Sequence, residues 1–186
     1  MGEFRKHNVY TKTSLEECWR KTGKAPIGTR WIDINKGDEK TPEYRSRLVA
    51  KEINTHKRDD LFAATPPLEA MKLLLSLAVT TGVSHEQTRR QRGYKLDFID
   101  VRRAYFHAPA RRPVYVQLPE EDAASGMCGR LNKAMYGTRD AAQNWEFAYA
   151  DFMEEADFTR GKANPCIFWH EKKSIRVVIH LSLIHI

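Results

Sequence analysis

Residues 95–110 read KLDFIDVRRAYFHAPA, and this stretch decides how the rest of the chain is interpreted. Its apolar side chains indicate a buried strand: Leu96, Phe98, Ile99 and Val101. The same strand holds Asp97 and Asp100. Aspartate is rare in strands because its side chain competes for backbone hydrogen bonds, and a buried carboxylate without a partner is costly. At least one of the two acids is therefore expected to have a partner.

Two interpretations of these acids stay open. Both could lie at the wet end of the strand and pair with a nearby arginine: Arg102, Arg103, Arg111 or Arg112. Alternatively, one of them serves a functional site. Strand side chains alternate between faces, so acids three residues apart point to opposite sides and do not hold one ion together. Tyr105 and Phe106 follow the strand, with Tyr105 five residues after Asp100.

Composition narrows the class of protein. The chain has 186 residues, of which 41% are hydrophobic and 30% charged, as in a soluble globular protein with one domain or two small lobes. A net charge of +7 favours a polyanionic partner, although many basic proteins bind no nucleic acid. The three scattered cysteines indicate no disulfide framework or zinc site and favour a reducing compartment. The N-terminus lacks a secretory signal, and the apolar C-terminal run is too short to span a bilayer.

Residues 14–53 predict a helix and a basic hairpin. Ser14 is a suitable N-cap for a helix beginning with LEECWRK. A strand with Trp31, Ile32 and Ile34, a turn at 36–38 and a second strand at 44–53 predict a two-stranded ribbon. Its basic side chains lie at alternate positions on one face: Arg45, Arg47 and Lys51. This face is either a solvated surface or a cationic ribbon over a triphosphate or phosphate backbone.

The middle of the chain predicts a core helix and a connector. Pro67 suits the first turn of a helix, and Gly82 ends it. Its apolar residues recur at helical spacing and predict a buried face: Leu68, Met71, Leu74, Leu75, Ala78 and Val79. The basic stretch 84–93 is the expected lobe boundary.

The remaining residues predict a strand at 114–118, a loop at 120–129 and a short apolar element ended by Gly137. A helix is expected to begin at Asp140 with Gln143 as its capping-box partner. Its expected buried stripe is Ala141, Trp145, Ala148, Tyr149, Phe152 and Ala156. A hairpin at 166–169 and 175–179 follows.

Seven collinear segments resemble the reverse transcriptase domain of copia-type long-terminal-repeat retrotransposons. They are GTRWIDINKGD, YRSRLVAKE, LFAATPPLEAMKLLLSLA, IDVRRAYFHA, RPVYVQLPEE, GRLNKAMYGTRDAAQNW and DFTRGKANPCIFW. The resemblance implies an α+β fold with reverse-transcriptase fingers and a partial palm, an antiparallel sheet with packed helices. The expected parts are an N-terminal flank at 1–25, a fingers-like part at 26–93, a partial palm at 94–180 and a non-native tail at 181–186.

The resemblance also implies roles for single residues. Asp100 corresponds to the first catalytic aspartate, which binds Mg²⁺ (or Mn²⁺) with the backbone carbonyl of Val101. Tyr105 corresponds to the aromatic gate that crowds a ribose 2′-hydroxyl. Arg47 corresponds to the residue that pairs with the incoming triphosphate, and Arg45, Lys36 and Lys51 are weaker candidates. Tyr136 and Gly137 correspond to the lining of the nucleotide and template side.

The chain departs from the family at three positions before its end. Asp140 stands where the family commonly has Gln, and Ala142 stands where it has Pro. A carboxylate next to a triphosphate is electrostatically unfavourable, so Asp140 is interpreted as a helix N-cap. Asp157 replaces a usual glycine and tolerates a left-handed turn.

The C-terminal segment lacks the acids that the resemblance implies. Family members follow the strand at 176–180 with a turn that bears two adjacent aspartates, whereas here LSLIHI follows and no carboxylate stands after Glu171. One Asp does not hold two divalent ions, so the site as written is expected to be incomplete. One frame of CTGTCTCTTATACACATC encodes LSLIHI, which resembles an adaptor of transposase-based sequencing libraries. We therefore expect the natural part of this sequence to end near His180 and the residues after it to be foreign.

The expected function is that of a fragment of a retrotransposon polyprotein whose complete reverse transcriptase performs RNA-directed DNA polymerisation. Expected partners are an RNA/DNA template-primer, deoxynucleoside triphosphates and the integrase, RNase H and protease of the polyprotein, with no membrane. The expected location is the cytoplasm, a virus-like particle or the nucleus. A non-catalytic nucleic-acid-binding module and a decayed element without activity are the alternatives.

Overall fold

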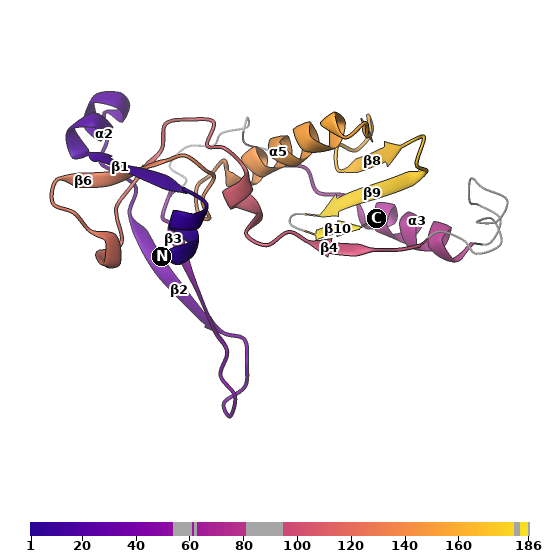
Figure 1. Ribbon diagram of the computed structural model, residues 1–186, viewed down its shortest axis with the longest axis horizontal. Helices are drawn as coiled ribbons and strands as arrows, with labels where there is room; N and C mark the ends of the chain where they lie inside the picture. The colour runs from indigo at the N-terminus through magenta and orange to yellow at the C-terminus, as the bar shows by residue number, and fades with distance from the viewer. Residues whose placement is uncertain (54–60, 62, 81–94, 181–182, 186) are drawn as a thin grey trace. The chain divides into compact units, whose positions relative to one another are not determined.

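The computed structural model describes residues 1–53, 61, 63–80, 95–180 and 183–185, the last three by their backbone (Figure 1). The chain divides into two compact units, one of Met1–Phe62 with Tyr105–Trp145 and one of Ala63–Ala104 with Glu146–Ile186. Both contain helices and antiparallel strand ladders, which confirms the predicted α+β class. Among the described residues, no helix is long and apolar enough to cross a membrane.

The first unit contains a three-stranded sheet in the order β1-β6-β5. These strands are β1 (Tyr10–Ser14), β6 (Met127–Leu131) and β5 (Tyr115–Val116), and η2 (Glu120–Asp122) precedes β6. The short helix α1 (Gly2–Lys6) precedes β1, and α2 (Leu15–Thr22) follows it. The first 25 residues therefore supply one strand and two helices of this unit.

Helix α2 begins where the sequence predicts. The Ser14 hydroxyl accepts a hydrogen bond from the backbone N–H of Glu17 at 3.1 Å and so satisfies one of the free donors of the first turn. Gly23 ends the helix with φ 64°, and its N–H donates to the Trp19 carbonyl at 2.8 Å. The predicted N-cap is confirmed.

The predicted basic ribbon is confirmed as β2 (Thr29–Asn35) paired antiparallel with β3 (Tyr44–Ala50). Figure 1 shows these two strands as a long, separate ribbon. Strand β3 ends earlier than the sequence suggests. At its last residue, Ala50, the backbone N–H donates to the Tyr136 carbonyl at 2.8 Å, and the next N–H, of Lys51, donates to the Gly28 carbonyl at 2.8 Å. The base of the ribbon is thereby fixed to the segment before α5.

Strand β6 overlaps the segment 120–129, which the sequence analysis assigned to a loop, so that prediction is wrong for its last residues. Glycine as a residue type favours loops, but Gly129 lies within β6 and allows Tyr10 to pack closely against the strand. A Cβ at Gly129 would lie 3.0 Å from Cγ of Tyr10 on the neighbouring strand. Apolar side chains around the sheet form the core of the unit: Phe4, Val9, Leu48, Ala50, Phe106, Val114, Val116, Leu131 and Met135.

The second unit contains a five-stranded sheet in the order β4-β10-β9-β8-β7. The strands are β4 (Phe98–Asp100), β10 (Leu183–His185), β9 (Ile175–His180), β8 (Ile167–His170) and β7 (Thr159–Arg160). Helix α3 (Leu68–Val79) belongs to this unit. Helix α5 (Ala141–Glu155) begins in the first unit and continues in the second, while η1 (Ala104–His107) follows β4.

Two elements expected to be buried are largely exposed. Along α3 the buried residue is Ala70, and three residues of the predicted face are exposed: Leu68 at 56%, Leu75 at 48% and Val79 at 82%. The other three residues of that face, Met71, Leu74 and Ala78, are half-buried. Phe98 in β4, an edge strand of the sheet, is 63% exposed. The predictions of a core helix and a buried strand are therefore wrong in burial, although both elements exist. Gly82 and the connector at 84–93 lie outside the described residues.

The predicted buried stripe of α5 is confirmed in part. Ala141, Trp145 and Tyr149 are buried, whereas Phe152 is 67% exposed and Met153 is buried four residues after Tyr149. Tyr149 packs edge-on against Phe168 of β8 at a centroid distance of 6.1 Å. The helix is followed by Asp157 at φ 64°, which confirms the predicted left-handed position.

Gly137→Ala is expected to destabilise the first unit by about 2–4 kcal/mol. Gly137 has φ 86°, and a Cβ there would lie 2.0 Å from the Ala50 carbonyl oxygen. Urea unfolding measures the loss. Gly126→Ala is the matched control, because Gly126 has φ 70° with nothing within 4 Å of the added Cβ. Equal losses in the two variants would contradict the close contact with Ala50.

Candidate functional site

Three of the residues assigned to nucleotide binding lie together in the first unit. The rings of Tyr105 and Tyr136 pack at a centroid distance of 4.6 Å and an angle of 41°. Burial raises the pKa of the Tyr105 hydroxyl, and Tyr136 raises it further, so this hydroxyl stays protonated at neutral pH. Gly137 follows Tyr136 and packs against Ala50 at the end of β3. The pair of tyrosines therefore borders the base of the ribbon.

Arg47 lies on the ribbon, in register with Ile32, and its side chain is exposed. Its guanidinium makes no hydrogen bond or ion pair with any residue that the structure describes. Arg45 differs, since its Nε lies 3.4 Å from Oε1 of Glu43. An exposed guanidinium offers a fork of donors that matches phosphate oxygens. Arg47 is therefore better placed than Arg45 to take an external phosphate.

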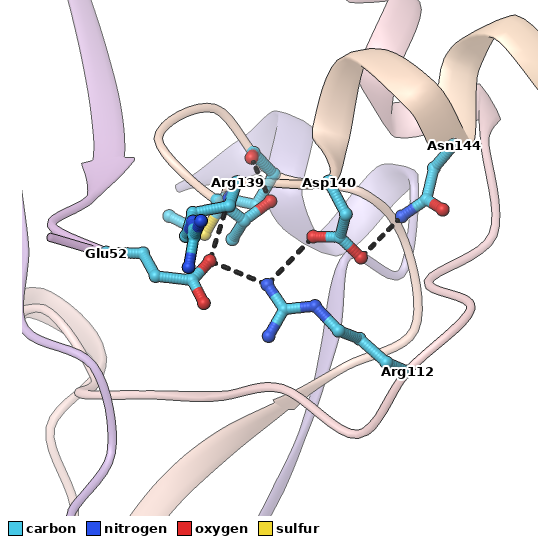
Figure 2. A network of polar contacts seen from close by, with 7 residues as sticks. Glu52, Arg112, Arg139, Asp140 and Asn144 are labelled. Carbon is cyan, nitrogen blue, oxygen red and sulfur yellow. Dashed lines mark hydrogen bonds and ion pairs between the residues drawn. The ribbon is translucent and has the colours of Figure 1, made fainter. Parts of the chain in front are cut away.

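A partly buried ionic network joins the residues after β3 to the start of α5 (Figure 2). Nη2 of Arg112 donates to Oε2 of Glu52 at 2.6 Å and to Oδ1 of Asp140 at 2.9 Å. Oδ2 of Asp140 accepts from the Asn144 amide at 3.0 Å, and Oε2 of Glu52 accepts from the Arg139 N–H at 2.8 Å. One guanidinium thus holds two carboxylates from distant parts of the sequence.

The environment of Asp140 decides between its two suggested roles. Asp140 is 5% exposed and directly precedes α5, as predicted. Burial by itself would raise the pKa of this carboxyl, but the hydrogen bonds and charge of Arg112 and the amide of Asn144 outweigh burial and lower it. Both of its carboxylate oxygens accept hydrogen bonds from side chains of the protein, Oδ1 from Arg112 and Oδ2 from Asn144. The capping box with Gln143 stays a prediction.

Asp140→Asn is expected to flatten the dependence of stability on pH in the acid range. A carboxyl whose folded pKa lies below its ordinary value of 3.8 stabilises the fold above that pH, and this contribution is lost as pH falls through the folded pKa. The wild-type chain should therefore lose stability below about pH 4 more steeply than the variant. Urea unfolding between pH 2 and 6 measures both slopes; parallel curves would contradict the assignment.

The second unit holds Asp100 at the end of β4, where its side chain is exposed. Leu183 of β10 pairs with Asp100 on one side and with His180 of β9 on the other. The start of β10 therefore lies beside Asp100, and the end of β9 lies one strand further along the same sheet. Asp97 has a separate partner, since its Oδ1 lies 3.4 Å from Lys95 Nζ at an exposed position.

Among the described residues, one predicted metal ligand can be assessed. Asp100 is an exposed carboxylate and fits a hard divalent cation as one ligand. No group of three or more His, Cys, Asp or Glu side chains that could hold a metal occurs among the described residues. Asp100 belongs to the second unit, whereas Arg47, Tyr105, Tyr136 and Gly137 belong to the first.

Sequence reasoning missed the Glu52–Arg112–Asp140 network. It considered Arg112 as a partner of Asp97 or Asp100, but Arg112 binds two other acids in the first unit. One signal was available. An aspartate that begins an amphipathic helix beside buried residues needs a cation or several donors. The identity of the cation depends on tertiary contacts that no local pattern contains.

The sequence also matches known proteins. The reverse transcriptase (RNA-dependent DNA polymerase) family matches residues 17–184, which is most of the chain and includes segments of both units. The chain belongs to the reverse transcriptase family. The resemblance described from the seven sequence segments is thereby confirmed.

Two curated relatives of this reverse transcriptase chain are retrotransposon polyproteins. The Retrovirus-related Pol polyprotein from transposon TNT 1-94 of Nicotiana tabacum is 26% identical over 177 residues, which cover 91% of this chain and 12% of the relative. The Retrovirus-related Pol polyprotein from transposon RE2 of Arabidopsis thaliana is 24% identical over 151 residues, or 76% of this chain and 10% of the relative. The chain thus spans about a tenth of the length of these relatives.

Proposed function

We propose that this chain is part of an RNA-directed DNA polymerase in a retrotransposon polyprotein. The basic ribbon corresponds to the fingers-like part at 26–93, and the sheet of the second unit, which holds Asp100, corresponds to part of the palm at 94–180. The family match and the two polyprotein relatives support this proposal. The partners are a template-primer, deoxynucleoside triphosphates and the other polyprotein domains, and the location is the cytoplasm, a virus-like particle or the nucleus.

One observation carries the proposal furthest. Leu183 pairs with both Asp100 and His180, so Asp100 and the end of β9 belong to one sheet, with β10 between them. The resemblance places two adjacent aspartates directly after the strand that corresponds to β9. In the complete protein such acids could join Asp100 in a site for Mg²⁺ or Mn²⁺. In such a site the ions stabilise the attacking 3′-hydroxyl and the departing pyrophosphate.

The residues of this chain have separate tasks in the proposal. Asp100 and the Val101 carbonyl hold a divalent ion. Arg47 binds a phosphate of the incoming nucleotide through its guanidinium fork. Tyr105 restricts the space at C2′ of the sugar with a ring that Tyr136 supports. Each task is the one that the family resemblance implies for that residue.

Primer extension on an RNA template tests the proposal. The chain as printed is expected to add no deoxynucleotide, because it has one of the required carboxylates. An extended version, in which β9 is followed by a turn with two adjacent aspartates and a family strand, is expected to extend the primer. Failure of the correctly folded extended version, with Mg²⁺ and with Mn²⁺, would contradict the proposed function.

Tyr105→Ala in the extended version is expected to raise the use of ribonucleotides relative to deoxynucleotides by about 10–100-fold, since removing a steric contact of this size changes discrimination by about 1–3 kcal/mol. Single-nucleotide kcat/KM values for dTTP and UTP measure the ratio. Phe106→Ala is unsuitable as a control because Phe106 is 4% exposed in the core. Tyr44→Ala, at a 70% exposed ribbon position, is the matched control and should leave the ratio unchanged.

A further inference from the structure

Two buried cysteines that are far apart in the sequence meet between α2 and β6 of the first unit. Cys18 is 1% exposed and Cys128 is 0% exposed, and both belong to one buried cluster with Tyr115. Cys18 lies on α2, which packs against β6. Cys128 lies on β6, in register with Thr13 of β1. The fold of one unit therefore brings these two thiols together.

The two thiols interact directly. The pKa of the Cys128 thiol is raised to about 11, first by burial and then by charge and hydrogen-bond interactions with the Cys18 side chain. A hydrogen bond between the two side chains requires that their sulfur atoms be neighbours. An S–S bond is about 2.05 Å long, so sulfur atoms at hydrogen-bonding distance must approach each other by about 2 Å to form one. Rotation of the two side chains can supply a shift of this size.

The surroundings of both thiols tolerate the loss of their hydrogens. Sγ of Cys18 donates to the Lys24 carbonyl at 3.4 Å, and Sγ of Cys128 donates to the Ser14 carbonyl at 3.7 Å. The Lys24 carbonyl also accepts from the Thr22 hydroxyl at 3.1 Å. Ser14 is the N-cap of α2, and an N-cap carbonyl accepts the first hydrogen bond of the helix, from the N–H four residues later. Oxidation of both thiols therefore leaves each carbonyl with a donor.

Cys18 is the thiol of this pair that a small reagent reaches first. It lines a cavity of about 530 Å³ in the first unit, whereas Cys128 is not among the described residues that line it. A hydroperoxide is much smaller than this cavity. Cys166 of the second unit is 0% exposed, and its Sγ lies 3.8 Å from the Tyr149 hydroxyl. It therefore serves as a reference for a buried thiol beside a tyrosine.

We propose that Cys18 and Cys128 form a reversible disulfide when a hydroperoxide enters this cavity. The Cys18 sulfur attacks the O–O bond and becomes a sulfenic acid, while the second oxygen leaves with the Cys18 proton as water or an alcohol. The Cys128 sulfur then attacks the Cys18 sulfur, the S–O bond breaks, and the hydroxyl leaves with the Cys128 proton as water. The two thiols lose two electrons in total, and the peroxide gains them. A dithiol reverses the reaction through a mixed disulfide.

Mass spectrometry of the oxidised chain tests the pairing. The full chain is reduced with dithiothreitol, freed of the reductant, treated with hydrogen peroxide, alkylated and digested with trypsin. The peptide 13–20 linked to the peptide 112–130 should exceed each pair that includes Cys166 by at least about tenfold, because the fold holds the first two thiols together. In concentrated urea this preference should disappear.

Substitutions separate the two steps. Cys128→Ser removes the second thiol, so dimedone should label the Cys18 sulfenic acid about tenfold more than in the wild-type chain. No label in this variant would contradict Cys18 as the thiol that reacts first. Cys18→Ser should give no linked peptide and leave Cys128 reduced. Cys166→Ser is the matched control, because it removes a buried thiol from the second unit and should leave the bond between Cys18 and Cys128 unchanged.

The bond should also stabilise the first unit, since it closes a loop of roughly 100 residues in the unfolded chain. The oxidised chain should unfold at a urea concentration about 1 M higher than the reduced chain, and peroxide should give Cys128→Ser no such rise. An unchanged midpoint would contradict a bond that fits the native contact of α2 with β6.

The proposal is overturned if peroxide leaves Cys18 and Cys128 as open to alkylation as Cys166, if the preferred pair includes Cys166, or if dithiothreitol does not restore the thiols. None of these measurements involves primer extension or a residue of the proposed polymerase site. Their failure would therefore contradict this disulfide alone and leave the proposed function unchanged.

Discussion

Asp100→Asn is expected to reduce RNA-templated primer extension by the extended version about a thousandfold. The amide keeps the size and shape of the side chain but removes the negative charge that binds a divalent cation. Asp100 is exposed and ends an edge strand, so the substitution leaves no buried group without a partner and the fold should be unchanged. Initial rates with saturating dTTP on a poly(A) template measure the effect.

Asp97→Asn is the matched control for this experiment. It removes the same charge three residues earlier, from a carboxylate that pairs with Lys95 at an exposed position. Its rate should stay within about twofold of the parent version, since exposed ion pairs contribute little. If Asp100→Asn kept the parent rate, or if both variants lost activity equally, the assignment of Asp100 as a metal ligand would be wrong.

Arg112→Met is expected to destabilise the first unit by about 3–5 kcal/mol, because it leaves two carboxylates near each other without their cation. The side chains of Glu52 and Asp140 are 17% and 7% exposed, so water screens them weakly. The midpoint and slope of urea unfolding at pH 7 measure the loss. Arg111→Met, at an exposed neighbouring position, is the control and should cost less than about 1 kcal/mol.

A triple variant separates the ion pairs from simple packing. Arg112→Met combined with Glu52→Gln and Asp140→Asn removes the buried charges together and should recover a large part of the stability lost by Arg112→Met. The Asn144 amide can still donate to the carbonyl oxygen of the new side chain, which takes the place of Oδ2 of Asp140. A triple variant as unstable as Arg112→Met would show that the side-chain volume of Arg112, and not its charge, stabilises this region.

Local sequence rules predicted the elements whose causes are local. The Ser14 cap, the alternating strands of the ribbon and the left-handed Asp157 all depend on a few neighbouring residues. The position of Asp140 before α5 belongs to the same class. The sequence also predicted that Asp100 ends a strand, and its resemblance to the reverse transcriptase family was correct.

The features that failed depend on distant residues. Strand β6 forms because β1 pairs with one of its edges and β5 with the other. Glycine is unfavourable in strands, so the residues around Gly129 do not indicate this pairing locally. The exposure of α3 and β4 depends on which of their faces other elements cover. Helical or strand periodicity does not specify those covering elements. The network around Arg112 joins residues 60 and 28 positions away in sequence. No local rule selects those partners.

The most direct test of the account is the sequence of DNA made on a heteropolymeric RNA template with all four deoxynucleoside triphosphates. The extended version should synthesise the complement of the template from an annealed primer, the chain as printed should synthesise none, and Asp100→Asn in the extended version should abolish the product. Two results would contradict the proposed polymerase function of the complete protein. One is equal product from the chain as printed and from the Asp100→Asn version. The other is a folded extended version that binds the template-primer but does not extend the primer.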